Sequence, residues 1–166
     1  MGNSHCAISI SHKLGHAVVA SAPPGWRIGI DLEQVRARDV LPLSDWMASD
    51  AEAAALAALP PEQALRHFYR LWTFKEAMIK ARGQDFPADL KTNTLTIDAA
   101  SGQWCMQTPG SVAWSLRQFE AEPGWLMSVV WRAPAGESAD IFWRLESDAP
   151  ATPFVSTLAC DDSARP

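Results

Sequence analysis

The chain has 166 residues, 48% of them hydrophobic and 20% charged, which is the composition of a soluble globular protein with one domain. Its formal net charge of −5 argues against a protein that binds nucleic acid by general neutralisation of phosphates, because that mode requires a basic surface, although a localised basic patch is compatible with this charge. The 3 cysteines have no CxxC spacing and favour reduced thiols in a cytoplasmic protein. The sequence has no signal-like N-terminus and no apolar stretch near about 18 residues, so we expect neither secretion nor a membrane span.

The predicted elements begin with strands. β-rich or apolar residues occupy positions 6–10 and 17–22, and the segment between them contains a glycine suited to a turn. A Pro-Pro-Gly break follows, and the segment RIGIDLEQ at 27–34 then alternates apolar and polar residues as a half-buried strand does. These segments predict two or three adjoining strands.

Two helices are predicted next. Residues 44–59 are rich in Ala, Leu and Glu, with Ser44 as a possible N-cap and two prolines at the end. A helix of about twenty residues is predicted from Pro61 to Arg82, because proline suits the first helical turn and Gly83 is a natural stop.

After Gly83 the composition returns to strands. The order of strands, two helices and more strands lacks the regular alternation of parallel βαβ units, so the fold class is α+β. We expect one domain over residues 1–146 and a flexible tail at 147–166, which is rich in Pro, Ala, Ser and Asp. The late predicted strands are 93–98, 103–108, 111–119, 125–131 and 140–145.

Two acidic residues share one face of the predicted strand at 27–34. Asp31 and Glu33 are two positions apart, so their side chains project to the same side, about 7 Å apart along the strand. A polar, solvated strand face is one explanation, since such alternation is common. The other explanation is half of a metal site, because two like charges side by side repel unless a cation lies between them.

A third carboxylate occupies an unexpected place on the long helix. At about 100° per residue, Glu76 falls within an apolar stripe that should face the core, so it needs a cation, a proton or a cavity. Lys80, at i+4, either pairs with Glu76 or stands beside it as a second functional group. Lys75 is expected off the edge of the stripe, where its ammonium could reach solvent or an anion. The stripe consists of Leu65, Phe68, Trp72 and Ile79.

The two observations explain each other if the helix packs across the strand. Asp31, Glu33 and Glu76 would then converge on a site with oxygen ligands alone, which suits Mg²⁺ and would also accept Mn²⁺. A salt bridge from Glu76 to Lys80 or to an arginine stays open as the simpler alternative.

The chain resembles a known family at these positions. GIDLE at 29–33 and WTFKEAMIK at 72–80 are similar to the two-part signature of the 4′-phosphopantetheinyl transferases. The segment at 9–20, which contains Ser11 and His12, resembles the type that activates surfactin synthetase, and so does Glu33 two residues after Asp31. The fixed positions of the signature are filled by Gly29, Ile30, Asp31, Trp72, Thr73, Lys75, Glu76, Ala77 and Lys80.

The resemblance implies a fold and a reaction. The fold would be an antiparallel sheet packed against a long helix plus a shorter one, one half of a two-half arrangement. The enzyme would transfer the 4′-phosphopantetheine arm of coenzyme A to a serine of an apo carrier protein of the acyl, peptidyl or polyketide kind, releasing 3′,5′-ADP. A non-catalytic module that binds a carrier protein or a phosphate is the alternative.

The resemblance also implies roles for the acidic and basic residues. Asp31, Glu33 and Glu76 would hold Mg²⁺ at the pyrophosphate of coenzyme A. Lys80, with Lys75, would stabilise the leaving phosphate and could protonate it. Glu76 would take the proton of the attacking serine, either directly or through a metal-bound water.

The Ser-His pair has an implied role too. Ser11 and His12 would contact the 3′-phosphate of coenzyme A, although His12 could simply be a turn histidine.

The chain departs from the family in its length, because the surfactin-type members have two similar halves and this chain matches only the second. It could self-associate to rebuild the site, be a fragment, or have lost activity. We expect a homo-oligomer, since an uncovered half would expose a sheet face or edge.

Overall fold

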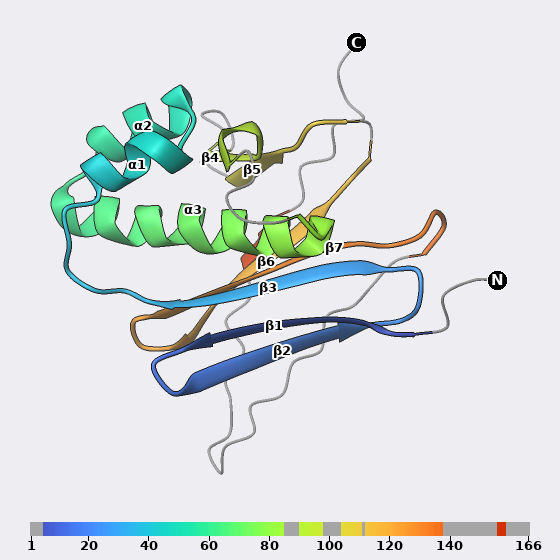
Figure 1. Cartoon of the computed structure of the whole chain (residues 1–166). Coiled ribbons are helices and arrows are strands. Elements are labelled where there is room, and N and C mark those ends of the chain that lie inside the picture. Colours follow the sequence, from blue (N-terminus) through green and yellow to red (C-terminus); the bar gives the residue numbers. More distant parts are fainter. Residues whose placement is uncertain (1–4, 85–89, 98–103, 111, 138–155, 159–166) are drawn as a thin grey trace.

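The computed structural model describes residues 5–84, 90–97, 104–110, 112–137 and 156–158. The chain forms β-strands at both ends of the sequence and helices between them, as Figure 1 shows. In chain order the elements are β1 (Ala7–Lys13), β2 (His16–Ala22), β3 (Arg27–Gln34), α1 (Leu41–Met47), α2 (Asp50–Ala57), α3 (Pro61–Arg82), the 3₁₀ helix η1 (Leu90–Thr92), β4 (Thr94–Ile97), β5 (Trp104–Gln107), β6 (Ser115–Glu122), β7 (Trp125–Arg132) and β8 (Ser156–Leu158).

A four-stranded antiparallel sheet with the order β3-β7-β6-β8 forms the centre of the fold. The long helix α3 lies along one face of this sheet (Figure 1), and Leu116 and Val130 of the sheet belong to the same buried apolar cluster as Phe74 and Met78 of the helix. The opposite face carries a second apolar cluster that includes Ile30 and is partly covered by the β1–β2 hairpin. The sheet is therefore buried on both faces near β3.

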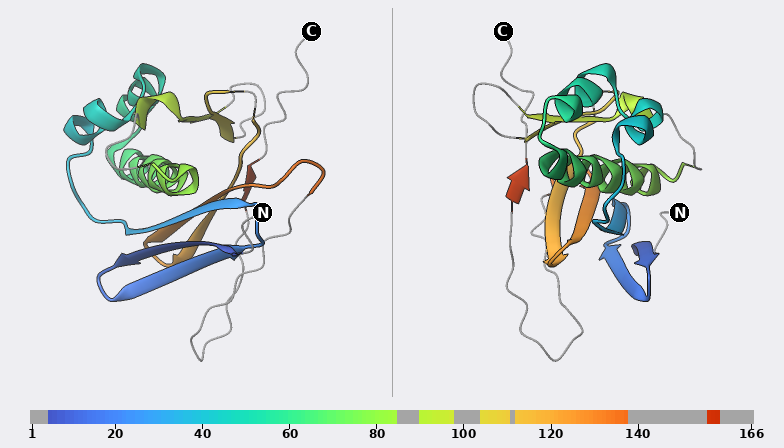
Figure 2. Two further views of the ribbon diagram at one scale, coloured as in Figure 1. Left: turned by 45° about the vertical axis from the view of Figure 1, so that its right-hand side comes forward. Right: turned by 90° about the vertical axis from the view of Figure 1, so that its left-hand side faces the viewer.

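A further layer covers the other side of α3. The helices α1 and α2 and the β4–β5 pair lie across it, so that α3 runs between this layer and the sheet (Figure 2). Leu71, Phe74 and Met78 are completely buried as a result. None of the described helices is both long and apolar enough to span a membrane.

The predicted α+β class is confirmed, and the two most clearly patterned elements have the predicted bounds. Strand β3 covers residues 27–34, and α3 runs from Pro61 to Arg82. Gly83 follows in the left-handed conformation with φ of 65°, which glycine adopts at little cost, and its N–H bonds the carbonyl of Lys80.

The predicted single helix at 44–59 is wrong. The chain breaks after Met47 and restarts at Asp50, because Ser49 and Glu52 form a reciprocal capping box that begins α2. Ser44, predicted as an N-cap, lies inside α1, where its hydroxyl donates to the carbonyl of Leu41 at 2.7 Å. The Ser-x-x-Glu spacing was the signal that could have located the break.

Most of the later strands occur near their predicted positions, as β4, β5, β6 and β7. The predicted flexible tail at 147–166 contains the short strand β8, which pairs with β6 at the edge of the sheet. The strand predicted at 140–145 lies outside the described residues.

Candidate active site

Strand β3 and helix α3 bring the predicted acidic residues to one place. Gly29, Asp31 and Glu33 lie on the side of β3 that faces α3, and Gly29 allows the closest approach. An added Cβ at Gly29 would overlap the carbonyl oxygen of Ala77 and lie 2.5 Å from the amide nitrogen of Ala81. The helix backbone therefore rests directly on the strand, two residues before Asp31.

Asp31 is almost completely buried at 5% exposure. Its Oδ1 accepts hydrogen bonds from Lys80 Nζ at 2.8 Å and from Ser11 Oγ at 2.9 Å. Its Oδ2 is buried and has no hydrogen-bond partner among the described residues. One carboxylate oxygen is thus held in place, while the other is enclosed and lacks a partner within the described ranges.

Glu76 lies beside this carboxylate at the edge of the buried surface of α3. Burial raises its pKa, and the carboxylates of Asp31 and Glu33 raise it further, while the ammonium groups of Lys80 and Lys13 lower it. The carboxylates of Asp31 and Glu33 are therefore near enough to Glu76 to act on its charge. Within the described ranges no side chain or backbone group donates a hydrogen bond to the carboxylate of Glu76.

The two lysines of the site pair with the strand rather than with the helix. Lys80 Nζ bonds the carbonyl of Ile30 at 3.1 Å in addition to Asp31, so the alternative of a Lys80–Glu76 salt bridge is not the pairing found. Lys13 Nζ lies 2.9 Å from the carboxylate of Glu33. Sequence reasoning missed Lys13, although its position two residues after Ser11 places both on one face of β1.

Strand β1 contacts β3 through side chains instead of a backbone ladder. The hydroxyl of Ser9 accepts from the N–H of Ile30 at 3.0 Å, and that of Ser11 accepts from the N–H of Leu32 at 3.2 Å. The side chain of Ser11 is buried at 6% exposure, and both of its hydrogen bonds, to Asp31 and from Leu32, are made with β3. His12 points to the opposite face of β1 and is exposed, so it alone of the Ser-His pair is accessible to a phosphate.

The predicted exposure of Lys75 is wrong. Its side chain is 1% exposed, and its ammonium donates to Glu52 Oε2 at 2.9 Å and to the carbonyls of Leu90 and Asn93. The helical wheel failed here because α3 is covered on two sides, so one apolar stripe does not mark its whole buried surface. Glu52 was also missed, and the capping-box spacing was its signal.

The oxygen donors of the site suit a divalent cation chemically. Among the described residues Asp31 offers a buried oxygen without a partner, and beside it lies Glu76, whose pKa is raised first by burial and then by the carboxylates of Asp31 and Glu33. In the described part of the chain, however, no three His, Cys, Asp or Glu side chains stand close enough together to hold a metal ion as they are. The oxygen donors are of the kind that a divalent cation binds. The carboxylates of Glu33 and Glu76 would have to move closer to Asp31 to bind the cation together with it.

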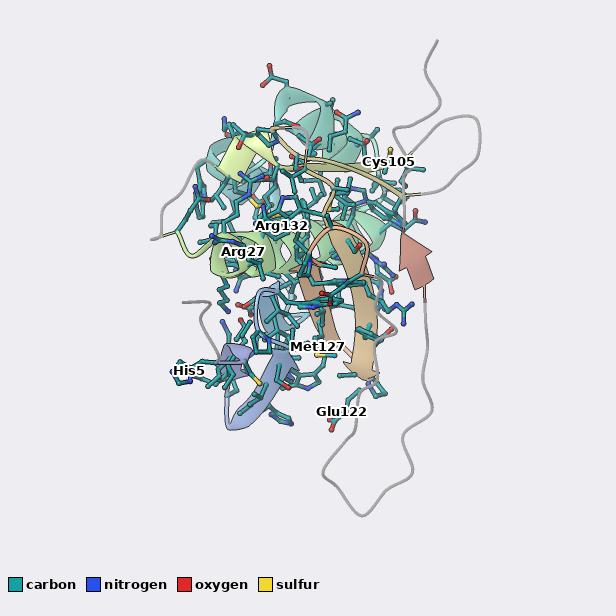
Figure 3. All side chains as sticks on the ribbon, turned by 90° about the vertical axis from the view of Figure 1, so that its right-hand side faces the viewer. His5, Arg27, Cys105, Glu122, Met127 and Arg132 are labelled. Carbon is teal, nitrogen blue, oxygen red and sulfur yellow. The ribbon has the colours of Figure 1, made fainter. Side chains whose placement is uncertain are left out.

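Arginines gather at the other end of the α3–β3 contact. Arg27 and Arg132 face each other across β3 and β7 (Figure 3). Arg27 Nη1 also donates to the carbonyl of Arg82 at 3.1 Å, where a cation complements the C-terminal end of the helix dipole. Arg82 and Arg132 both lie over the ring of Trp114, at 5.7 and 5.3 Å from its centre.

Comparison with known proteins matches the region that contains the site. The family model of the 4′-phosphopantetheinyl transferase superfamily matches residues 27–130, which include β3, α3 and β7. A solved structure of a holo-(acyl-carrier-protein) synthase from Bacillus anthracis, in complex with CoA (3′,5′-ADP), superposes with a TM-score of 0.55 at 17% identity. The superposition covers 64% of this chain and 94% of that one, and it shows a shared fold.

Curated relatives match over a similar share of the chain. The 4′-phosphopantetheinyl transferase AcpT of Salmonella typhimurium is 31% identical over 112 residues, which are 61% of this chain and 58% of the relative. The 4′-phosphopantetheinyl transferases psf-1 of Bacillus pumilus and Sfp of Bacillus subtilis are 29% and 28% identical, over 65% and 61% of this chain. The chain thus spans about half the length of these relatives, at 58%, 46% and 45%.

Proposed function

This chain belongs to the 4′-phosphopantetheinyl transferase superfamily, and we propose that it transfers the 4′-phosphopantetheine arm of coenzyme A to a serine of an apo carrier protein. The observation that supports this most is the meeting of Asp31, Glu76 and Lys80 at the α3–β3 contact, with Asp31 Oδ2 buried and unpartnered among the described residues. We also propose that the protein is cytoplasmic, because its odd number of cysteines without CxxC spacing favours reduced thiols.

Asp31, Glu33 and Glu76 are the residues that would hold Mg²⁺, and Mn²⁺ would suit the same hard oxygen donors. When bound, the cation supplies neutralisation of charge on the diphosphate of coenzyme A. The support is the donor set itself, together with the raised pKa of Glu76 beside two other carboxylates.

The protein's own groups account for the proton and the leaving group. The serine oxygen of the carrier forms a new bond to the β-phosphorus of coenzyme A, the bond from that phosphorus to the bridging oxygen breaks, and 3′,5′-ADP leaves. Glu76, which lies beside Asp31 and receives no hydrogen bond from the described residues, takes the serine proton. Lys80, 30% exposed at its side chain, donates to the departing phosphate.

A labelling experiment tests the reaction. The protein is incubated with Mg²⁺, coenzyme A carrying a fluorophore on its thiol, and apo carrier proteins of the acyl, peptidyl and polyketide kinds. We expect the fluorophore on the carrier serine of at least one of them. Labelling of none would leave the alternative, a module that binds without transferring.

Ser11 has a role in this proposal as the partner that orients Asp31. We expect Ser11→Ala to weaken Mg²⁺ binding about 10- to 100-fold, as removal of a hydrogen bond behind a metal ligand does. Ser9→Ala is the matched control, because it removes the same kind of hydroxyl bond to β3 without touching Asp31. Titration calorimetry with Mg²⁺ in the presence of coenzyme A measures both, and equal affinities would contradict the role of Ser11.

We also propose that the chain self-associates through the outer face of the β1–β2 hairpin. Ile8, Ile10 and Val19 lie together on this face with 64%, 57% and 64% exposure, and Ile10 pairs with Val19 in the hairpin. Scattered apolar residues are normal on a surface, whereas a contiguous group favours an interface. Light scattering behind size exclusion should give a mass above 18.1 kDa, and Ile10→Lys should lower it; an active monomer would contradict this proposal.

A further inference from the structure

We propose that Lys75 and Glu52 are positioning residues for the transfer, and that Lys75 makes no contact with coenzyme A. This inference rests on the proposed function. Lys75 directly precedes Glu76, and a lysine beside a catalytic carboxylate would ordinarily be assigned to a substrate phosphate. Its contacts assign it elsewhere.

The ammonium of Lys75 is fully used inside the protein. An ammonium has three N–H donors, and here they reach Glu52 Oε2 at 2.9 Å, the carbonyl of Leu90 at 2.8 Å and that of Asn93 at 2.7 Å. The side chain is 1% exposed. A phosphate could bind this group only if the layer above α3 opened.

Glu52 is the matching half of the pair, with 0% exposure. Besides Lys75, its Oε2 accepts from the N–H of Ser49 at 2.8 Å, and its Oε1 accepts from the N–H of Leu95 at 2.8 Å. The two side chains therefore tie the start of α2, the segment from η1 to β4, and α3 to one another. A buried pair with all its hydrogen bonds made fixes geometry, because any shift leaves a polar group without a partner.

The pair sets the rotation of α3 about its own axis. Helix α3 runs between the upper layer and the sheet (Figure 2). Consecutive helical residues point about 100° apart, so holding Lys75 in the upper layer directs Glu76 to the side, towards Asp31 on β3. Lys80 follows Glu76 by four residues and lies on the same side. The backbone contact at Gly29 holds the opposite side of the helix. The two contacts together leave α3 little freedom to turn.

Steady-state kinetics on three variants, well below their melting temperatures, test the assignment. We expect Lys75→Met and Glu52→Gln each to lower kcat about 10- to 100-fold, with the KM for coenzyme A unchanged within about twofold. The double variant E52Q/K75M should recover part of the lost kcat and Tm, because neither partner then carries an unpaired buried charge. Lys80→Met is the contrasting control, expected to weaken the binding of coenzyme A measured by calorimetry.

Four results would overturn the proposal. A KM for coenzyme A raised at least about tenfold in Lys75→Met would make Lys75 a substrate ligand. Lower Tm values with unchanged kcat would make the pair structural only. A double variant as impaired as Lys75→Met, or insolubility of all three variants, would remove the claim that the pair acts through mutual neutralisation. If the wild-type chain labels no carrier, the proposed function itself fails, which is a separate outcome.

Discussion

Replacing Glu76 by glutamine is expected to lower the rate of phosphopantetheine transfer by roughly 10²- to 10⁴-fold, the usual contribution of a positioned general base. Glutamine has the shape of glutamate but can neither accept the serine proton nor add negative charge beside Asp31. The fold should not suffer, since no hydrogen bond within the described residues depends on the carboxylate of Glu76.

Stability should even rise slightly in metal-free buffer near neutral pH. The pKa of Glu76 is higher in the folded chain than in the unfolded one, so the folded state binds more protons between those two values. The free energy of unfolding therefore falls as pH rises through that window, and ionised Glu76 costs stability above it. Glutamine removes the cost, so the Tm of Glu76→Gln should equal or exceed that of the wild type.

A carrier-labelling time course and a thermal melt in EDTA measure both expectations. Glu62→Gln is the matched control, because Glu62 is an exposed glutamate in the first turn of the same helix. It should label carriers at close to the wild-type rate. Wild-type labelling by Glu76→Gln would remove Glu76 from the mechanism, and a large fall in its Tm would show that the carboxylate has a structural role.

Local signals were enough to predict the two elements that build the site. The strict alternation of apolar and polar residues predicted β3. A proline at the start and a glycine after the end of the helical pattern predicted α3. The same alternation placed Asp31 and Glu33 on one face of the strand. Their meeting with Glu76 then needed only the assumption that α3 crosses β3.

The errors came from contacts between layers. A helical wheel assumes one buried side, whereas α3 has the sheet on one side and α1, α2 and β4 on the other, so Lys75 is buried although it lies off the apolar stripe. The bonds from Ser11 to β3 could not be predicted either. These bonds join two strands through side chains, and no sequence pattern for backbone strand pairing predicts them.

Gly29→Ala is expected to cause the largest loss of stability of any change considered. The new methyl group would overlap backbone atoms of Ala77 and Ala81, and backbone cannot move aside by changing a rotamer. Overpacking in cores costs about 1–3 kcal/mol and occasionally more, and we expect about 3 kcal/mol or more here, a large part of the stability of a typical domain. Chemical denaturation followed by circular dichroism measures it.

Gly83→Ala is the control for the general cost of losing a glycine. Gly83 has a left-handed φ of 65°, so alanine there is strained, but its Cβ would meet nothing within 4 Å. We expect a loss of about 1–2 kcal/mol. If Gly29→Ala cost no more than Gly83→Ala, close contact between strand and helix would not be the reason for glycine at position 29.

The Gly29→Ala variant should also lose activity in the fraction of molecules that still folds. Relief of the overlap requires α3 to move away from β3, and Glu76 and Lys80 move with the helix while Asp31 stays on the strand. A displacement of about 1 Å between reacting groups can cost about 10²-fold in rate. We therefore expect folded Gly29→Ala to label carriers far more slowly than folded Gly83→Ala. The glycine two residues before Asp31 would then determine how closely the helix brings its base and its lysine to that carboxylate.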